Sequence, residues 1–357
     1  MEIFILALAV FLLALSIFNF ALIRRPQAPT RISRGISVII PVRNESENIA
    51  NLVKTLKAQT DIDDIEYIFV NDSSTDNTKE QILRETSGDP RFLLVDAPPL
   101  QDGWLGKPWA MQQGYLKSRE STLICLDADV RLSTNAIAQG IELLQKSKLD
   151  FISPYPRQIA ITLAERLIQP LLQWSWLSTV PLRIAEKLSI PSMAVANGQF
   201  FIIQRSALEK IGGFTSIASQ VIDDVELARS LIRSGAHGSV VDGSNLAVTR
   251  MYSSFNELRQ GYGKSLWKGF GGRLGAIFVI IFLALTGMAP LILGLTSHPL
   301  GWIAFFIVTL SRALSAITAR GRIADSFLHP LSTALLIYLI IYSWKSRGLV
   351  QWKGRTL

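Results

Sequence analysis

Two clusters of acidic and polar residues follow short apolar runs in this chain. The first, Asn71–Asp76, comes after Ile65–Val70, and the second, Asp127-Ala128-Asp129, comes after Leu123–Leu126. The apolar runs are typical of buried strands, and a parallel α/β sheet presents its ligand-binding groups at the carboxyl ends of such strands. Carboxylates at alternate positions there can hold a hard divalent cation that also binds a diphosphate. The clusters therefore indicate a site for an activated nucleotide.

A third acidic pair, Asp223 and Asp224, lies just downstream of Gly212-Gly213-Phe214. Paired acids at the start of a helix can simply favour the helix dipole. They can also transfer protons, because a neighbouring like charge raises the pKa of a carboxylate toward the range useful for a base. The residues alone leave both interpretations open.

Lys107 lies in the segment Gly103–Ala110, which is rich in glycine and tryptophan. Pro108 suits the first turn of a helix, so the segment can be an ordinary turn and helix start. A lysine at this point can also reach a bound diphosphate.

Apolar runs alternate with helical patterns between Gly35 and about Arg250. The expected strands are 36–41, 67–70, 92–95 and 122–126, and the expected helices are 45–58, 76–85 and 108–118. Such an alternation predicts a mostly parallel sheet with helices on both faces, which is an α/β fold.

Apolar residues gather at both ends of the chain. The run Ile3–Ile23 is about 20 residues long, enough to cross a bilayer. Glu2 stands where a signal peptide has basic residues, so we expect a retained anchor. The arginines that follow it, at 24, 25, 31 and 34, favour a cytoplasmic position for the next segment.

Three further apolar stretches, 276–295, 302–319 and 331–342, lie near the C-terminus. If all three crossed the membrane, the basic tail would lie outside, against the positive-inside tendency. We therefore expect the short third stretch to be re-entrant or interfacial. Leu163–Leu182 is apolar but interrupted by charges and prolines, and we expect an interfacial helix there rather than a span or a core helix.

These patterns divide the chain into consecutive segments. They are a membrane anchor (1–23), a basic linker (24–34), the α/β domain (35–250), an interfacial segment (251–274), membrane segments (275–344) and a basic tail (345–357).

The composition narrows the class of protein. Hydrophobic residues make up 49% of the 357 residues, the mean hydropathy is +0.30 and the net charge is +8. The basic residues cluster beside apolar segments, which fits an anionic membrane surface better than nucleic acid. The single cysteine, Cys125, excludes an intramolecular disulfide, and the three scattered histidines do not support a histidine metal site.

The opening segment Val38–Glu45, together with the acidic clusters downstream, resembles family-2 glycosyltransferases of the GT-A fold over residues 37–250. The resemblance implies a Rossmann-like catalytic domain in which the opening segment contacts the nucleobase, through Pro41, Arg43 and Glu45. It also implies that Asp72 binds the nucleoside. Many relatives carry a further aspartate where this chain has Asn71, so Asp72 is the main candidate of its cluster.

The resemblance gives the other motifs roles as well. Asp127-Ala128-Asp129 matches the DXD motif, in which Asp129 would ligate Mg²⁺ or Mn²⁺ and Asp127 would contact the nucleotide sugar. Asp224 matches the base that deprotonates the acceptor, with Asp223 supporting it. The residues bordering the acceptor pocket would be Asn197, Gly198 and Gln199. The Gly-Lys-x-x-Ala pattern around Lys107 is similar to that of the bacterial branch acting on carotenoids and hopanoids, and favours contact with the diphosphate.

One motif of the family is missing. Processive synthases carry Gln-x-x-Arg-Trp, whereas the nearest segment here, Gln260–Gly269, has a lysine in place of the arginine and a different spacing. This difference predicts a non-processive enzyme. Trp267, with the neighbouring lysines, can either close over the site and contact the acceptor or form an aromatic belt at the membrane interface.

The resemblance implies an inverting transfer of a sugar from a UDP- or GDP-sugar to a hydroxyl of a membrane lipid. A carotenoid or another isoprenoid is the first expectation for the acceptor, and diacylglycerol, ceramide or polyprenyl phosphate are the alternatives. The enzyme would be integral to the inner or plasma membrane, with its catalytic domain in the cytoplasm. A non-catalytic scaffold that binds sugar nucleotides is the competing class, and a base such as Asp224 speaks against it.

Overall fold

The computed structural model describes residues 1–347, 351–352 and 355–356, so part of the expected basic tail (345–357) lies outside the described residues. The chain forms two compact units. The α/β unit comprises residues 24–157 and 184–249, and the helical unit comprises residues 1–23, 158–183 and 250–357. Residues 158–183 were expected inside the domain 35–250, but their contacts group them with the helical unit.

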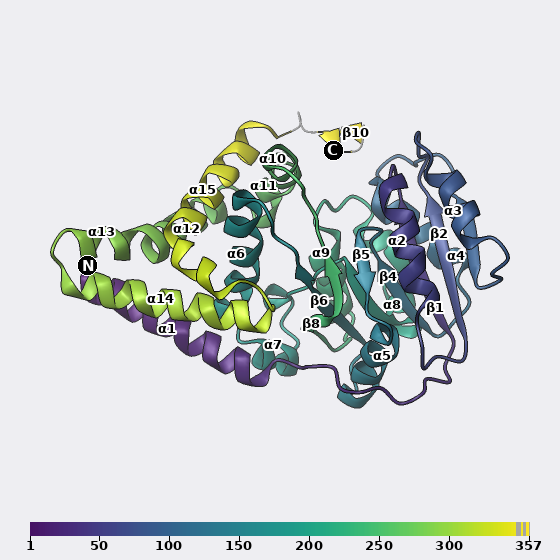
Figure 1. Ribbon diagram of the computed structural model, residues 1–357, viewed down its shortest axis with the longest axis horizontal. Coiled ribbons are helices and arrows are strands. Elements are labelled where there is room, and N and C mark those ends of the chain that lie inside the picture. The colour runs from purple at the N-terminus through teal and green to yellow at the C-terminus, as the bar shows by residue number, and fades with distance from the viewer. Residues whose placement is uncertain (348–350, 353–354, 357) are drawn as a thin grey trace. The chain divides into compact units, whose positions relative to one another are not determined.

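The α/β unit is built on an eight-stranded sheet with the order β3-β2-β1-β4-β7-β6-β8-β5 (Figure 1). Its strands are β1 (Ile36–Val42), β2 (Ile65–Asn71), β3 (Phe92–Asp96), β4 (Thr122–Leu126), β5 (Val130–Leu132), β6 (Phe151–Gln158), β7 (Phe200–Gln204) and β8 (Gly238–Thr249). The strands β3, β2, β1 and β4 are parallel, whereas β7 pairs antiparallel with β4 and β6. The sheet confirms the expected α/β class, with antiparallel pairing added on one side.

Helices cover both faces of this sheet. One apolar core joins α2 (Ser46–Lys57), α3 (Thr78–Thr86) and α5 (Ala136–Ser147) to residues such as Val38 and Phe69. The other core joins α4 (Gly106–Lys117), α8 (Arg205–Lys210) and α9 (Asp223–Arg233) to residues of opposite strand parity, such as Ile39 and Ile68. Successive strand residues point to opposite faces, so both faces of the central strands are apolar.

The helical unit contains four helical stretches long and apolar enough to cross a membrane: Glu2–Leu22, Arg273–Leu295, Pro299–Thr318 and Ile323–Lys345. Its helices are α1 (Glu2–Leu22), α6 (Leu163–Thr179), α10 (Phe255–Gly263), α11 (Leu266–Gly269), α12 (Arg273–Leu283), α13 (Ala289–Leu295), α14 (Pro299–Thr318) and α15 (His329–Lys345). The third C-terminal stretch looked short in the sequence, but a 3₁₀ turn before α15 extends it to 23 residues. Its length is therefore sufficient for a span.

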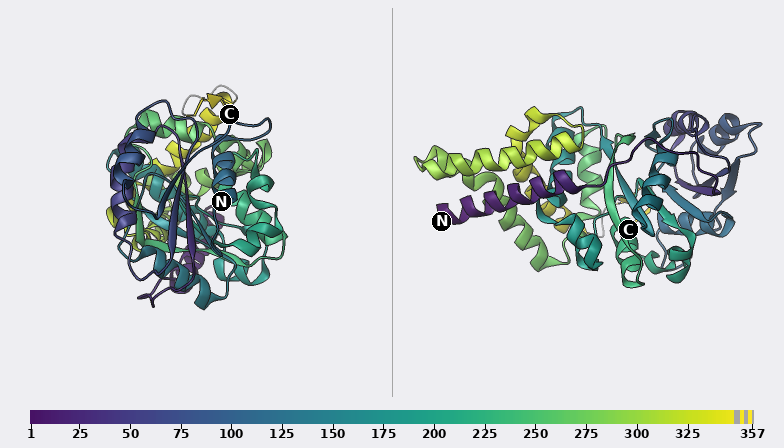
Figure 2. Two further views of the ribbon diagram at one scale, coloured as in Figure 1. Left: turned by 90° about the vertical axis from the view of Figure 1, so that its right-hand side faces the viewer. Right: turned by 90° about the horizontal axis from the view of Figure 1, so that it is seen from below.

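The helix α6 packs inside the helical unit. It lies against α1, α14 and α15, and Ile168, Leu171 and Trp174 on it are fully buried. The helices α1 and α14 run side by side (Figure 2). Because α6 supplies so much of this core, it belongs to the helical unit although its sequence interrupts the α/β domain.

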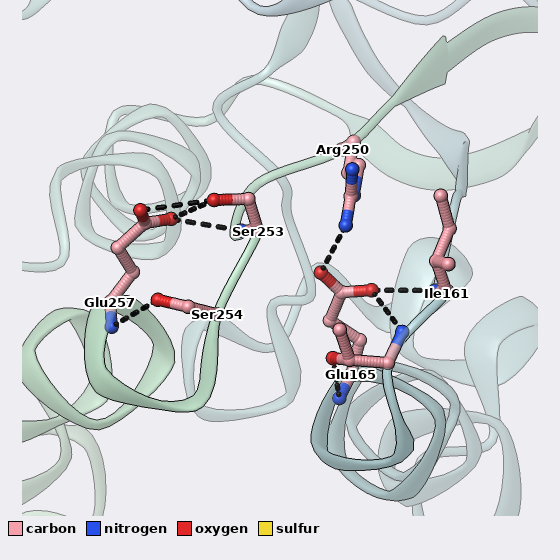
Figure 3. Close-up of polar contacts among 7 residues, drawn as sticks. Ile161, Glu165, Arg250, Ser253, Ser254 and Glu257 are labelled. Carbon is pink, nitrogen blue, oxygen red and sulfur yellow. Dashed lines mark hydrogen bonds and ion pairs between the residues drawn. The ribbon is translucent and has the colours of Figure 1, made fainter.

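Two buried or capping glutamates fix the starts of α6 and α10 (Figure 3). Glu165 accepts hydrogen bonds from the backbone N–H groups of Ile161 (2.5 Å) and Thr162 (2.9 Å) and pairs with Arg250 at 3.1 Å. Glu257 accepts from the backbone N–H of Ser253 at 2.8 Å. Both glutamates thus satisfy N–H groups that precede a helix.

Candidate functional site

The strands β1, β2 and β4 end at one edge of the sheet. They are parallel and adjacent, so the loops that follow them meet there. Pro41 lies in β1 opposite Val70 of β2, and Asp127 directly follows β4. The structure therefore brings the first two acidic clusters of the sequence to a common edge.

Arg43 connects the loop after β1 with the loop after β2. Its Nη1 donates to the carbonyl oxygens of Asp72 (2.6 Å) and Ser73 (3.2 Å), and the backbone N–H of Asp72 donates to the carbonyl of Val42 at 2.9 Å. Asp72 is buried, with 4% of its surface exposed. Arg43 thus positions the segment that carries Asp72.

The remaining polar residues of the first cluster support the loops. Asn71 donates to Asp96 at 2.8 Å, and Asp76 accepts from the backbone N–H groups of Ser46 and Thr78. Asp76 therefore caps two neighbouring helices, α2 and α3.

Lys107, in the first turn of α4, joins the second and third acidic clusters. Its Nζ lies 2.7 Å from Asp127 Oδ1 and 3.6 Å from Asp223 Oδ2, and each of the three side chains is about a quarter exposed. Burial alone would lower the pKa of Lys107. The negative charges of Asp127 and Asp223 raise it by more than that, so the pKa lies above its ordinary value. The lysine is a stable cation between two carboxylates.

Asp224 is held by backbone N–H groups. Gly198 N–H donates to its Oδ2 at 2.9 Å, and Val225 N–H donates to its Oδ1 at 2.8 Å. A Cβ atom at Gly198 would lie 3.1 Å from Asp224 Cβ and 3.3 Å from Lys107 Nζ, so this close approach favours glycine. Burial, and next the charge of Asp223, raise the pKa of Asp224 to about 6.

Asp129 has a different environment. Its Oδ2 accepts from the Thr249 hydroxyl at 3.0 Å, and that hydroxyl accepts from Gln199 Nε2 at 3.3 Å. Burial, and next the charge of Asp127, raise the pKa of Asp129 to about 6. No basic side chain within the described ranges forms an ion pair with Asp129. It is therefore a partly buried carboxylate without an ion-pair partner among the described residues.

The acceptor-side segment is tied to the acidic clusters through its backbone. Asp127 N–H donates to the carbonyl of Gln199 at 3.0 Å, and Gln199 N–H donates to Asn197 Oδ1 at 2.8 Å. The backbone N–H of Asn197 in turn donates to Ser153 Oγ at 2.7 Å. This segment thus fixes the position of Asp127 relative to Asp224.

Sequence reasoning missed Thr249 and did not foresee every contact of the residues that it named. Thr249 is 1% exposed at the end of β8, and no motif marks it; a polar residue ending an apolar strand was the only signal. Trp267 belongs to the helical unit, where its backbone N–H donates to Ser343 Oγ and its Nε1 donates to the carbonyl of Lys264, each at 3.0 Å. Its role toward an acceptor stays a prediction.

The arrangement combines a fixed cation, a carboxylate with a pKa near neutrality and an uncompensated carboxylate. Glu45 adds negative charge near Asp127 and Asp129. Within the described part of the chain, no three His, Cys, Asp or Glu side chains gather closely enough to hold a metal ion by themselves. A cation bound here would complete its coordination with ligand or water oxygens, as Mg²⁺ commonly does beside phosphates.

Comparisons with known proteins identify related sequences. Residues 37–212 match the family model described as glycosyl transferase family 2. A 4,4'-diaponeurosporenoate glycosyltransferase of Staphylococcus haemolyticus is 26% identical over 351 residues, covering 90% of this chain and 88% of the relative. The enzyme of the same name from Staphylococcus aureus is 26% identical over 354 residues, covering 93% and 92%.

The fold also matches a solved structure. A mannosyltransferase from Pyrobaculum calidifontis, in complex with GDP-mannose and Mn²⁺, aligns with a TM-score of 0.55 and 17% identity, over 96% of this chain and 98% of that one. The family match over residues 37–212 and the similarity to named glycosyltransferases over most of the chain lead to one conclusion. The chain is a glycosyltransferase that carries a family-2 domain over residues 37–212.

Proposed function

We propose that the enzyme adds a single sugar, with inversion, from a nucleotide-sugar donor to a membrane-dissolved lipid. The observation that carries the proposal is the position of Lys107, whose Nζ lies 2.7 Å from Asp127 and 3.6 Å from Asp223. Asp127 belongs to the donor-binding motif and Asp223 to the pair with the base. One lysine thus holds the residues assigned to the two substrates close together. An in-line displacement requires the two substrates to be adjacent.

Donor binding is assigned to the edge loops. Pro41, Arg43, Glu45 and Asp72 would bind the nucleoside of a UDP- or GDP-sugar, and Asp127 and Lys107 would contact the sugar diphosphate. Lys107 can exchange a carboxylate partner for a phosphate oxygen without losing its charge compensation. Retention of the positive charge is favoured by its raised pKa.

The residues present fit a divalent cation. Asp129 is a hard oxygen ligand without a basic partner among the described residues, and a nearby cation would relieve its repulsion from Asp127. We assign Asp129 as the ligand of Mg²⁺ or Mn²⁺, with Thr249 orienting the carboxylate. When bound, the ion would stabilise negative charge on the departing diphosphate.

Asp224 is assigned as the general base for a hydroxyl acceptor. Two N–H groups fix its carboxylate, and its pKa of about 6 leaves it mostly ionised at neutral pH yet more basic than an ordinary aspartate. The proton of the acceptor hydroxyl would pass to Asp224. The hydroxyl oxygen would form the new bond to the anomeric carbon of the sugar as the bond from that carbon to the nucleoside diphosphate breaks.

The acceptor is proposed to be a carotenoid or another isoprenoid. The four stretches able to span a membrane favour a lipid, and the relatives are named for diaponeurosporenoate. The ending of that name denotes a carboxylate, which favours a second candidate: transfer to a carotenoid carboxylate. Such an acceptor is already an anionic nucleophile at neutral pH and needs no base. Diacylglycerol, ceramide and polyprenyl phosphate remain the alternative acceptors.

The catalytic unit is proposed to face the cytoplasm of a bacterial cell, at the inner or plasma membrane. Arg24, Arg25, Arg31 and Arg34 follow the first candidate span, which favours this side. An impermeant amine label added to intact cells should leave Lys54, which is exposed, and Lys79, which is partly exposed, unmodified. Labelling of either lysine without lysis would contradict the orientation.

The function is tested by transfer assays with the full-length protein in lipid nanodiscs. Radiolabelled UDP-glucose and GDP-mannose would be offered with a carotenoid alcohol, a carotenoid carboxylic acid or diacylglycerol. We expect labelled carotenoid product, its loss with EDTA and its recovery with Mn²⁺. Labelled diacylglycerol alone would overturn the acceptor assignment, and undiminished transfer in metal-free buffer would overturn the metal assignment.

A further inference from the structure

The helical unit buries an arginine that has no hydrogen-bond or ion-pair partner among the described residues. Arg312 lies on α14, is 2% exposed and has a buried, unbonded Nη1. His329, at the start of α15, is also 2% exposed, and neither of its ring nitrogens is hydrogen-bonded. The buried hydroxyls of Thr309 and Ser332 likewise have no partner within the described part of the chain.

These four side chains form two pairs, one on α14 and one on α15. Thr309 and Arg312 are three residues apart on α14, and His329 and Ser332 are three apart on α15, so each pair shares a helix face. Arg312 and His329 are near enough for their charges to interact. We call this group the Arg312 cluster.

Trp174 of α6 connects the two helices beside the Arg312 cluster. Its Nε1 donates to the hydroxyl of Ser311, the neighbour of Arg312, at 2.6 Å. The centre of its ring lies 4.6 Å from that of His329, in an edge-on arrangement. Three helices therefore surround the cluster.

The nearest acid does not pair directly with Arg312. Asp325 is 3% exposed and is held by Arg166, whose Nη2 lies 2.5 Å from Oδ1 and whose Nε lies 3.1 Å from Oδ2. Arg322 approaches the same carboxylate at 4.0 Å. One carboxylate thus faces two arginines directly and interacts with Arg312 only at longer range, so it cannot compensate all three positive charges.

Several other buried polar groups of the same unit are satisfied, although Arg259 Nε and Trp344 Nε1 are buried without a hydrogen-bond partner among the described residues. The hydroxyls of Ser16 and Ser311 lie 2.9 Å apart, and Asn19 donates to the carbonyl of Leu177 at 2.8 Å. Buried polar groups are normally hydrogen-bonded, and a buried charge normally has a partner. An ionisable residue inside a membrane segment indicates a functional site.

We propose that the Arg312 cluster binds one acidic group, a carboxylate or a phosphate, carried by a membrane lipid. The guanidinium of Arg312 supplies the charge and a pair of N–H donors, and the hydroxyls of Thr309 and Ser332 and one ring nitrogen of His329 supply further donors. A lipid is the source because both α14 and α15 belong to candidate membrane spans. The proposal rests on the helical unit alone and does not depend on glycosyl transfer.

The first test uses the wild-type full-length protein in detergent. Its thermal unfolding would be followed with oleate, with oleyl alcohol as the neutral lipid of the same chain, and with inorganic phosphate as a free anion. We expect oleate to raise the melting temperature in a saturable manner and the other two to leave it nearly unchanged. Equal effects of oleate and oleyl alcohol, or no effect of any probe, would overturn the site. If phosphate raised the melting temperature as much as oleate, the site would bind free anions, and the assignment of a lipid as the carrier of the acidic group would be wrong.

The second test compares two arginine variants by native mass spectrometry of bound oleate. Arg312→Gln should weaken binding about 10- to 100-fold, as expected for the loss of a charged hydrogen-bonding group. Arg320→Gln is the matched control, since it removes the same charge from an exposed position just after α14. Equal affinity of the two variants would overturn the proposal. If Arg312→Gln fails to fold, the proposal is decided by the melting temperatures of the wild-type protein with oleate, oleyl alcohol and phosphate.

Discussion

The α/β unit and the helical unit differ in whether their charged side chains have ion-pair partners. In the α/β unit, Lys107 has two acidic neighbours, at 2.7 and 3.6 Å, whereas Arg312 of the helical unit has no ion-pair partner among the described residues. Asp129 shows the opposite case, because it is a partly buried acid without an ion-pair partner within those residues. A charge that the chain compensates can hold its site in place before a ligand arrives. A charge without such a partner supports the two proposals made above, a cation at Asp129 and an acidic group at Arg312.

Asp129→Asn is expected to have the largest effect, because it removes the charge on which the metal assignment depends. We expect the initial rate of sugar transfer to fall by about 10³-fold or more, which is the upper end for a lost electrostatic contact to the reacting groups. The variant should remain folded and membrane-bound. Transfer rates and Mn²⁺ titration would be measured together.

Thr249→Val is the control for this change, since it keeps the carboxylate and removes only the hydrogen bond that orients it. Its Mn²⁺ affinity should fall by about tenfold, as for other groups that orient a metal ligand. If Asp129→Asn kept the wild-type rate, Asp129 would not be a required metal ligand. A carboxylate without an ion-pair partner would then be no evidence for a bound cation in the α/β unit.

Asp224→Asn tests whether the third acidic pair does chemistry. It keeps size and hydrogen-bonding capacity but cannot take a proton, so kcat for a hydroxyl acceptor should fall by roughly 10²–10⁴-fold. Binding of the nucleotide sugar, measured by titration, should change little. Asp223→Asn should cost less, because its assigned role is to tune Asp224. If Asp223→Asn is inactive and Asp224→Asn is active, the roles of the two residues are reversed. If both variants are fully active with a carotenoid carboxylate, the acceptor is one that needs no base.

Much of the α/β unit was predictable, because its strands and loops have local signals. The strand 122–126 was predicted with the bounds that β4 has, and Asp127 and Asp129 follow it as expected. The pairing of Lys107 with Asp127 was not predictable, since it joins residues brought together only by the packed sheet. Thr249 was missed for the same reason.

The helical unit was less predictable. Its apolar runs gave the candidate spans, but hydropathy does not report which polar residues find partners, so the Arg312 cluster had no signal in the sequence. Chain order suggested one continuous domain that includes 158–183, whereas the apolar face of α6 packs with α1, α14 and α15. Sequence patterns describe each helix but not the neighbour that covers it.

Asn19→Leu tests the satisfied side of the helical unit. The Asn19 amide donates to the carbonyls of Leu177 (2.8 Å) and Val180 (2.7 Å), and its oxygen accepts from the backbone N–H of Leu182 at 3.1 Å. Loss of these bonds should lower the free energy of unfolding by about 1–3 kcal/mol, seen as a lower melting temperature. Asn256→Leu, at an exposed position of α10, is the control. A melting temperature equal to that of the control would show that polar groups buried in this unit need no partner, which would weaken the argument from Arg312.

The smallest expected effect is a shift in the pH profile of kcat. Asp224 must be ionised to act as a base, so with a hydroxyl acceptor the rate should be low below its pKa of about 6 and rise to a plateau above it. Asp223→Asn removes a like charge and should lower the pKa of Asp224, moving the midpoint to lower pH by less than about one unit. Glu226→Gln is the matched control, because Glu226 lies in the same first turn of α9 but pairs with Arg233 at 2.6 Å. If Asp223→Asn and Glu226→Gln leave the same midpoint, Asp223 does not tune the base. A rate independent of pH between 5 and 8 would instead indicate an acceptor that arrives already ionised, and Lys107 would then serve to compensate the acidic pair rather than to link it to the donor.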